Sequence, residues 1–163
     1  MVGMAELREF LSELGFANSR SLLQSGNLLF EAAESDASSL EHRLETEAAA
    51  RLDLNADFIV RSGEEWKAVI QNNPFPAEAR RDPGHLLVMF CKEEVDPAKV
   101  AALQTTVTGP EVLRHGGREI YIVYPEGVGR SRLTHSRVEK QLGTRATGRN
   151  WNTVLRLGAL VTS

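Results

Sequence analysis

The first residues of the chain repeat apolar side chains three or four positions apart. These are Met4, Leu7, Phe10, Leu11 and Leu14, and a glycine follows at position 15. Such spacing places the apolar side chains on one face of a helix, and glycine is the usual residue just after a helix C-terminus. The pattern therefore predicts an amphipathic helix over residues 4–14.

Two short apolar runs follow this helix. They span Arg20–Gln24 and Asn27–Glu31 and are joined through Ser25-Gly26. Runs of this length around a glycine predict two strands with a tight turn, or one strand with a bulge.

A second helix is expected over residues 37–52, because apolar residues recur there every four positions. Ser38 and Glu41 stand three residues apart at its start, which is the spacing of a capping box. Residues 56–61 are then expected to form a strand.

The remainder of the chain alternates helical and strand patterns in the same way. The sequence predicts a helix opened by Ser62-x-x-Glu65 and ended before 72–76, and then a polar linker at 77–84. A buried strand at 85–91, a helix from the Asp96-Pro97 cap to Leu103, and a hairpin of 111–114 and 118–124 around 115–117 are expected next. The last expected elements are a helix that carries Val138 and Leu142 and ends at Gly143, a short strand at 144–148, and a helix at 151–161.

Taken in order, these elements form two copies of one motif, and the first copy is incomplete. The second part is β-α-β-β-α-β-α and the first is α-β-β-α-β, and both resemble the β-α-β-β-α-β plait. We therefore expect an α+β protein of two plait-like (ferredoxin-like) lobes with antiparallel sheets and a C-terminal helix. The expected division is a lobe at 1–62, a helix and linker at 63–84, and a lobe at 85–163.

The first lobe lacks its opening strand in this arrangement. The plait usually places that strand centrally, and unpaired buried backbone groups cost about 1–3 kcal/mol each. We therefore hypothesise that Met1 is not the natural start, or that a second lobe or a second molecule supplies the missing pairing.

Composition sets the class of protein. The chain has 163 residues, 42% apolar and 25% charged, which is near the average for globular domains. No apolar run approaches the roughly 20 residues that cross a bilayer, and no secretory signal is visible, so a cytoplasmic location without membrane contact is expected. The single cysteine, Cys91, lies in an apolar run and is expected to be buried; the four scattered histidines predict no metal site, and no cofactor is expected.

Charge divides the chain unevenly. Residues 1–113 carry 10 Lys or Arg against 19 Asp or Glu, net −9, whereas residues 114–163 carry 9 against 3, net +6. The basic segment favours either a surface that faces an anion or pairing with the acidic part of the chain.

The richest polar cluster runs from Gly117 through Gly127-Val128-Gly129 to Thr134. A strand, a glycine loop and a helix start in that order expose backbone N–H groups that favour an anion. Arg130, Ser131, Arg132 and Thr134 are the side chains that would add donors, although neither a P-loop nor a dinucleotide fingerprint is present. The alternative is a glycine turn in which Ser131 or Thr134 caps the helix.

A second cluster, Arg149-Asn150-Trp151, precedes the last helix. Arg149 is a candidate anion contact and Asn150 a candidate contact or helix cap, while Trp151 is expected in the core. Two helix N-termini flanked by arginines would form one anion site if they converge, which sequence alone does not decide.

Several motifs together resemble one known family. They are Met4-Ala5-Glu6-Leu7, Leu14-Gly15-Phe16, Gln24-Ser25-Gly26-Asn27, Asn73-Pro74-Phe75, Gly117-Arg118-Glu119-Ile120-Tyr121, Gly127-Val128-Gly129-Arg130-Ser131 and Arg149-Asn150-Trp151-Asn152-Thr153. Taken in this order they are similar to the bacterial domain-of-unknown-function family numbered 1697. The resemblance implies a two-lobed α+β fold of plait-like units and no assigned activity. Family members usually begin with a strand and a glycine-rich, Arg-Gly-Ile-Asn-like segment that this chain lacks.

Three functions compete at this point. The leading hypothesis is a binding module for a phosphate-bearing ligand, a nucleotide or a nucleic-acid backbone, with Tyr121 offered to a base in the nucleic-acid version. The second is an enzyme on a small anionic substrate, with Ser131 or Thr134 near His115 or His135. The third is a structural or oligomerisation role, such as a homodimer in which acidic and basic parts pair between subunits.

Overall fold

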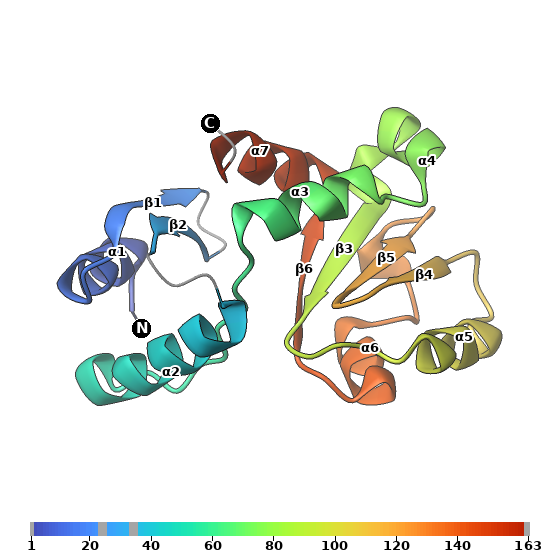
Figure 1. Ribbon diagram of the computed structural model, residues 1–163. Coiled ribbons are helices and arrows are strands. Elements are labelled where there is room, and N and C mark those ends of the chain that lie inside the picture. Colours follow the sequence, from blue (N-terminus) through green and yellow to red (C-terminus); the bar gives the residue numbers. More distant parts are fainter. Residues whose placement is uncertain (1, 23–25, 33–35, 162–163) are drawn as a thin grey trace. The chain divides into compact units, whose positions relative to one another are not determined.

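The computed structural model describes residues 2–22, 26–32 and 36–161, and the chain divides into two compact units, Met1–Ser62 and Gly63–Ser163. We call them unit 1 and unit 2. Both mix helices with an antiparallel sheet, so the protein is α+β (Figure 1).

The described part of unit 1 contains two helices and one antiparallel pair of strands. Its elements are α1 (Met4–Glu13), β1 (Ala17–Leu22), β2 (Asn27–Glu31) and α2 (Ala37–Leu52). The helix expected at 4–14 is confirmed, and its apolar face gives Phe10 and Leu11 to a core shared with Leu44 and Ala48 of α2. The first strand lies at 17–22 instead of 20–24, and Gln24 of the expected strand and Ser25 of the expected turn lie outside the described residues.

Two expectations about unit 1 are wrong. The second helix is capped by Asp36, whose carboxylate accepts from Ser38 N at 3.3 Å, and not by a capping box of Ser38 and Glu41. The Glu41 carboxylate accepts instead from Val60 N at 2.7 Å. Residues 56–61 form no strand, since within the described part of unit 1 the sheet has two strands, β1 and β2.

Unit 2 is built on a four-stranded antiparallel sheet with helices on both faces. Its elements are α3 (Gly63–Gln71), α4 (Pro76–Arg81), the 3₁₀ turn η1 (Pro83–His85), β3 (Leu86–Cys91), α5 (Pro97–Thr106), β4 (Val112–Gly116), β5 (Glu119–Val123), the 3₁₀ turn η2 (Val128–Arg130), α6 (His135–Leu142), β6 (Ala146–Asn150) and α7 (Trp151–Val161). The strand order is β4-β5-β3-β6. Residues 77–84, expected as a polar linker, form most of α4 and η1.

Alternate residues of the central strands cover the two faces. Met89 and Cys91 of β3 pack with residues of α5 and α6, so Cys91 is buried as expected. On the other face Trp66 of α3 stacks on Phe90 at 4.5 Å between ring centroids, and its indole Nε1 donates to Val154 O of α7 at 2.9 Å. Figure 1 shows α3 and α7 on one side of the sheet and α5 and α6 on the other.

Candidate functional site

The ends of two strands bring the two candidate segments to one end of the sheet of unit 2. Leu86, the first residue of β3, pairs with Val123, the last of β5, and Leu87 pairs with Asn150, the last of β6. Neighbouring strands lie about 4.8 Å apart, so the ends of β5 and β6 lie about 10 Å apart on either side of β3. We call this region the Leu86 end. The loop 124–134 and the start of α7 both leave the sheet there.

The loop 124–134 is held by its own hydroxyl groups. Ser131 Oγ accepts from Leu133 N at 3.0 Å, and Thr134 Oγ1 accepts from Arg137 N at 3.2 Å, which caps α6. Leu133 is buried, and its carbonyl accepts from Tyr124 Oη at 2.9 Å. The helix therefore begins at His135 and not directly after the glycines, with Gly127 at φ 87° starting the turn. These contacts fit the capping alternative for Ser131 and Thr134.

Arg130 and Arg132 stand on the exposed side of this loop. A guanidinium presents several donors in a plane and binds phosphate oxygens two at a time. These two side chains are the part of the predicted site that is available to a ligand.

In the second segment, Asn150 caps a helix and Trp151 packs in the core. Asn150 Oδ1 accepts from Thr153 N at 3.1 Å and so caps α7, and Trp151 is buried as expected. Arg149 lies one residue inside the sheet, where its guanidinium donates to Thr147 Oγ1 at 2.7 Å and Gly148 O at 2.8 Å. The side chain thus runs along β6 away from the Leu86 end. Burial lowers the pKa of this guanidinium.

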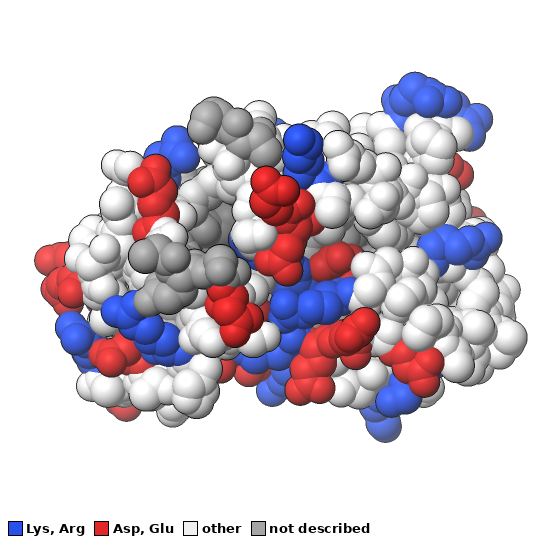
Figure 2. Space-filling model, viewed as in Figure 1, with Lys and Arg blue, Asp and Glu red and all other residues white. Residues whose placement is uncertain are grey.

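The other basic residues of the C-terminal segment are spread over unit 2. Arg114 donates to Leu113 O, Arg118 to Lys92 O, and Arg137 to Thr106 O and Thr106 Oγ1. Figure 2 shows both acidic and basic side chains on the face that it draws. Arg114, Arg118 and Arg137 therefore bind outside the loop 124–134, in which Arg130 and Arg132 are the exposed arginines.

The expected histidine partners of Ser131 and Thr134 have other contacts. His115 Nε2 lies 2.7 Å from Val95 O, and His135 Nε2 lies 3.3 Å from a carboxylate oxygen of Glu139. The hydroxyls of Ser131 and Thr134 accept from backbone amides. This geometry gives no support to a serine-type or threonine-type nucleophile in the loop.

His85 is at the Leu86 end, and the sequence analysis did not single it out. Its Nδ1 lies 2.9 Å from Asp82 Oδ2, and its Nε2 lies 3.6 Å from the position that a Cβ would take on Gly127. The carboxylate fixes the ring, because it accepts the proton on Nδ1 and leaves Nε2 toward the loop. The spacing of Asp82 and His85, three residues apart across a Pro-Gly pair, was the signal available in the sequence.

The sheet face does not offer Tyr121 to a base. The ring is 2% exposed, and its hydroxyl donates to Val69 O of α3 at 2.7 Å. Since α3 and α7 cover this face, stacking of a base on Tyr121, expected for the nucleic-acid version, is wrong.

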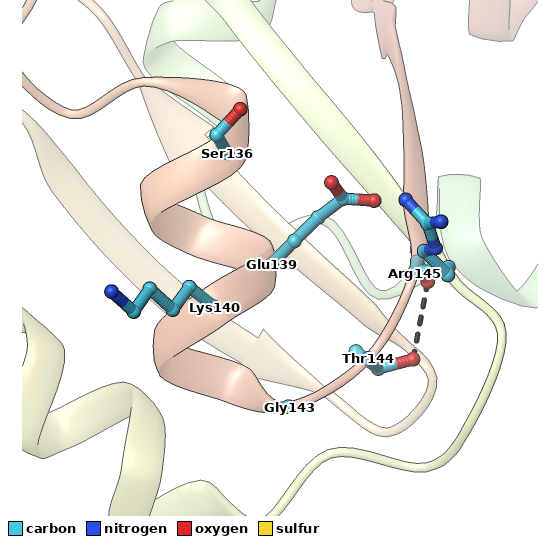
Figure 3. A pocket seen from close by; sticks show the side chains of 6 residues that line it. All are labelled: Ser136, Glu139, Lys140, Gly143, Thr144 and Arg145. Carbon is cyan, nitrogen blue, oxygen red and sulfur yellow. Dashed lines mark hydrogen bonds between the residues drawn. The ribbon is translucent and has the colours of Figure 1, made fainter.

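A shallow hollow of about 400 Å³ lies elsewhere, beside the last turn of α6 (Figure 3). Its lining residues are Ser136, Glu139, Lys140, Gly143, Thr144 and Arg145. Glu139 Oε2 accepts from Ala146 N and Thr144 Oγ1 accepts from Glu93 N, so these polar groups serve the fold. The predicted site residues are not among those that line it.

The described part of the chain contains neither a cluster of metal ligands nor a membrane-spanning helix. No group of three or more His, Cys, Asp or Glu residues there is placed to hold a metal ion. None of the helices described is both long enough and apolar enough to span a bilayer.

Comparison with known proteins gives one family and a solved structure of similar fold. The sequence model of a family described as "Protein of unknown function (DUF1697)" matches residues 1–121. The solved structure of a conserved bacterial protein from Streptococcus pneumoniae is similar at 27% sequence identity with a TM-score of 0.77, over 100% of this chain and 91% of that chain. No curated protein matches the sequence.

Proposed function

The chain belongs to the DUF1697 family, whose function is unknown, and we propose that it is a binding module for a phosphate-bearing ligand. The site is the loop 124–134 at the Leu86 end of unit 2. Arg130 and Arg132 supply the cations, and Asn150 borders the site from the end of β6.

One observation carries this proposal. The register places Val123 and Asn150 on either side of the first residues of β3, so the two segments that the sequence marked as anion-binding reach one end of the sheet. In open sheets, loops that leave the same end of neighbouring strands commonly build the ligand site.

One side of the loop carries side chains that suit a phosphate group. Two exposed guanidinium groups stand two residues apart, and the His85 ring lies beside Gly127 at the start of the turn. Ser131 and Thr134 shape the loop through their backbone hydrogen bonds rather than by contacting the ligand. Arg149 donates to Thr147 Oγ1 within β6, so we leave it out of the proposed ligand contacts.

The order of elements in unit 2 also supports a ligand site at the ends of the strands. Unit 2 has the element order β3-α5-β4-β5-α6-β6 with the sheet order β4-β5-β3-β6, and this order supports our assignment of a ferredoxin-like plait. Because helices cover both sheet faces, the ends of the strands are the part of this plait left for a ligand. A buried Cys91, the single cysteine of the sequence, fits a reducing compartment such as the cytoplasm.

Titration calorimetry with pyrophosphate and with a short single-stranded oligonucleotide tests the proposal. Hydrogen bonds to charged groups contribute about 1.5–3 kcal/mol each, so the Arg130→Ala, Arg132→Ala double variant is expected to bind at least about tenfold more weakly. Arg51→Ala, which removes an exposed arginine of unit 1 paired with Glu47, is the matched control and should bind as the parent chain does.

Salt dependence separates the proposal from its alternatives. Binding to phosphates should weaken steeply between low and moderate salt, because bound cations are released. No binding at low salt, or affinity that does not change with salt, contradicts the proposal. Sedimentation at the same two salt concentrations tests the structural alternative, because a salt-sensitive dimer without ligand binding favours pairing between subunits. Turnover of a bound phosphate ester, measured separately, would favour the enzyme.

A further inference from the structure

Main-chain hydrogen bonds fix the positions of Asp82 and His85 at the Leu86 end. Asp82 N donates to Glu78 O at the end of α4 at 2.8 Å, and Asp82 O accepts from His85 N at 3.1 Å. His85 continues β3 by one residue, because its carbonyl accepts from Tyr124 N at 2.8 Å. One residue of the pair is thus anchored to a helix and the other to the sheet.

The register of the sheet turns the His85 side chain toward the loop 124–134. Leu86 pairs with Val123, so the next pair along the two strands is His85 with Tyr124, and opposite residues share one face of a sheet. Tyr124 belongs to the core that α5 and α6 cover, and the loop leads from Tyr124 to α6. This agrees with the 3.6 Å between His85 Nε2 and the position that a Cβ would take on Gly127.

The two ring nitrogens of His85 have different roles. Nδ1 lies 2.9 Å from Asp82 Oδ2, and an ionised carboxylate only accepts, so Nδ1 carries the proton and Nε2 holds the lone pair. The side chains of His85 and Asp82 are 43% and 54% exposed, so a small solute reaches Nε2. A carboxylate beside Nδ1 stabilises the positive charge that the ring gains when Nε2 forms a bond.

The exposed arginines of the loop follow Gly127 closely. Arg130 is three residues after Gly127, and three residues span at most about 11 Å. The turn in which Ser131 N donates to Val128 O at 3.1 Å shortens this path, and Arg132 follows two residues later. Because guanidinium groups bind phosphoryl oxygens, neighbouring segments supply both a nucleophilic nitrogen and the cations that suit a phosphoryl group.

We propose that His85 accepts a phosphoryl group on Nε2, with Asp82 as its positioning residue. The inference rests on the proposed function, because Arg130 and Arg132 bind the phosphoryl oxygens. The lone pair of Nε2 forms the new P–N bond, the bond from phosphorus to the leaving group breaks, and its electron pair departs with that group. Nδ1 keeps its proton, so the positive charge of the ring lies beside the Asp82 carboxylate.

The donor belongs to a class whose leaving group needs no proton from the protein. Tyr124 Oη, the hydroxyl opposite His85 in the sheet, donates its proton to Leu133 O at 2.9 Å and so does not serve as an acid for the leaving group. Acyl phosphates and phosphoramidates meet this condition. An acyl phosphate releases a carboxylate, and phosphoramidate, whose nitrogen carries three protons at neutral pH, releases ammonia.

Reaction of the full chain with phosphoramidate tests the proposal, with other histidines as internal controls. Peptide mass analysis at timed intervals gives the rate at each histidine. His85 should gain one phosphoryl group at least about tenfold faster than His42, an exposed histidine of unit 1. Equal rates at the two residues, or no reaction at His85, overturn the proposal.

His135 is the matched control for exposure and for a carboxylate partner. Its side chain is 45% exposed, but its Nε2 lies 3.3 Å from Glu139 Oε2. His135 should therefore react no faster than His42. A rate at His135 equal to that at His85 would show that any exposed histidine beside a carboxylate reacts, and this result overturns the proposal.

The position of the phosphoryl group on the ring tests the role of Asp82. Phosphorus NMR of the parent chain should show the Nε2 isomer at His85. Asp82→Asn should slow the reaction at His85 at least about tenfold and give both isomers, because an amide both donates and accepts and no longer fixes the proton on Nδ1. The parent rate with the Nε2 isomer alone overturns this role. Slow exchange of the Tyr124 amide reports that the backbone of His85 stays in place.

The Arg130→Ala, Arg132→Ala double variant separates this inference from the proposed function. It should slow phosphorylation of His85 at least about tenfold and leave His42 unchanged, and the parent rate at His85 overturns the inference. Calorimetry with pyrophosphate is run on the same samples. Pyrophosphate binding without phosphorylation of His85 overturns this inference alone. Phosphorylation that depends on the arginines, without pyrophosphate binding, contradicts the proposed function alone.

Discussion

The chain contains two tyrosines, and both donate a hydrogen bond from a buried site. Tyr121 Oη reaches Val69 O at 2.7 Å, and Tyr124 Oη reaches Leu133 O at 2.9 Å. Burial raises the pKa of both phenols, and the carboxylates of Glu119 and Glu111 raise the pKa of Tyr121 and of Tyr124 further. Tyr124 thereby fixes the loop that carries Arg130 and Arg132, so its protonation state bears on the proposed site.

The Tyr124 phenol should make stability fall at alkaline pH. Its pKa is raised to about 12 in the folded chain from an ordinary value of 10.0. Below pH 10 the phenol is protonated in both states, and its contribution to the free energy of unfolding is complete. Between pH 10 and 12 the unfolded chain releases the proton first, so the free energy of unfolding falls as pH rises. Urea unfolding at several pH values measures this.

Tyr124→Phe is the matched control for that measurement. The variant loses one buried hydrogen bond and should be less stable by about 1 kcal/mol at neutral pH, with a flatter alkaline dependence. Absorbance at the tyrosinate band checks the same point. A folded chain whose tyrosines ionise near pH 10 contradicts the expected shift.

At the scale of elements, polar side chains decide where helices begin. Asp36, Asp96, Thr134 and Asn150 each accept from an amide of the following first turn. Two of these caps, Thr134 and Asn150, are also residues that the sequence nominated for anion binding. An anion at a helix N-terminus and a side-chain cap use the same N–H groups, so the presence of the caps moves the proposed binding chemistry to the arginines.

Thr134→Ala should therefore lower stability and leave phosphate affinity nearly unchanged. Loss of a helix cap costs about 1 kcal/mol, and Thr134→Ser should restore most of it because serine keeps the accepting oxygen. Urea unfolding measures the first effect and calorimetry with pyrophosphate the second. Ser136→Ala, at an exposed position of the same helix, is the control. A large loss of affinity in Thr134→Ala with normal stability would show that the hydroxyl contacts the ligand.

At the scale of the whole molecule, the two units differ in how completely they bury their sheets. Unit 2 has four strands with helices on both faces, whereas the described sheet of unit 1 is the hairpin β1-β2. A two-stranded hairpin is marginally stable in water unless further strands or helices cover it. Unit 1 relies on α1 and α2 for its core.

Separate fragments should show this difference. A fragment of residues 63–163 is expected to unfold cooperatively in urea and to keep near-ultraviolet dichroism, because it contains both tryptophans, Trp66 and Trp151, in packed sites. A fragment of residues 1–62 is expected to unfold without a clear transition. Slow amide exchange throughout β2 in the isolated 1–62 fragment would contradict the expectation that this pair of strands is marginally stable.

The sequence by itself determined the elements whose hydrogen bonds are local. The helices at α1 and α7 follow from apolar spacing, and the Asp96-Pro97 start of α5 follows from its cap, because a helical residue bonds to the fourth residue before it. Buried strands such as β3 were also recognisable, since a short run of apolar residues between turn signals has few other uses.

The tertiary structure alone decided where non-local partners were needed. Residues 56–61 have a strand pattern but no ladder among the described residues, and Glu41 binds Val60 N instead of closing a capping box. Arg149 likewise turned toward Thr147, and the meeting of β5 and β6 beside β3 followed only from register. Strand pairing and the direction of a long side chain depend on residues far along the chain, so a local pattern states which groups are available but not which groups they meet.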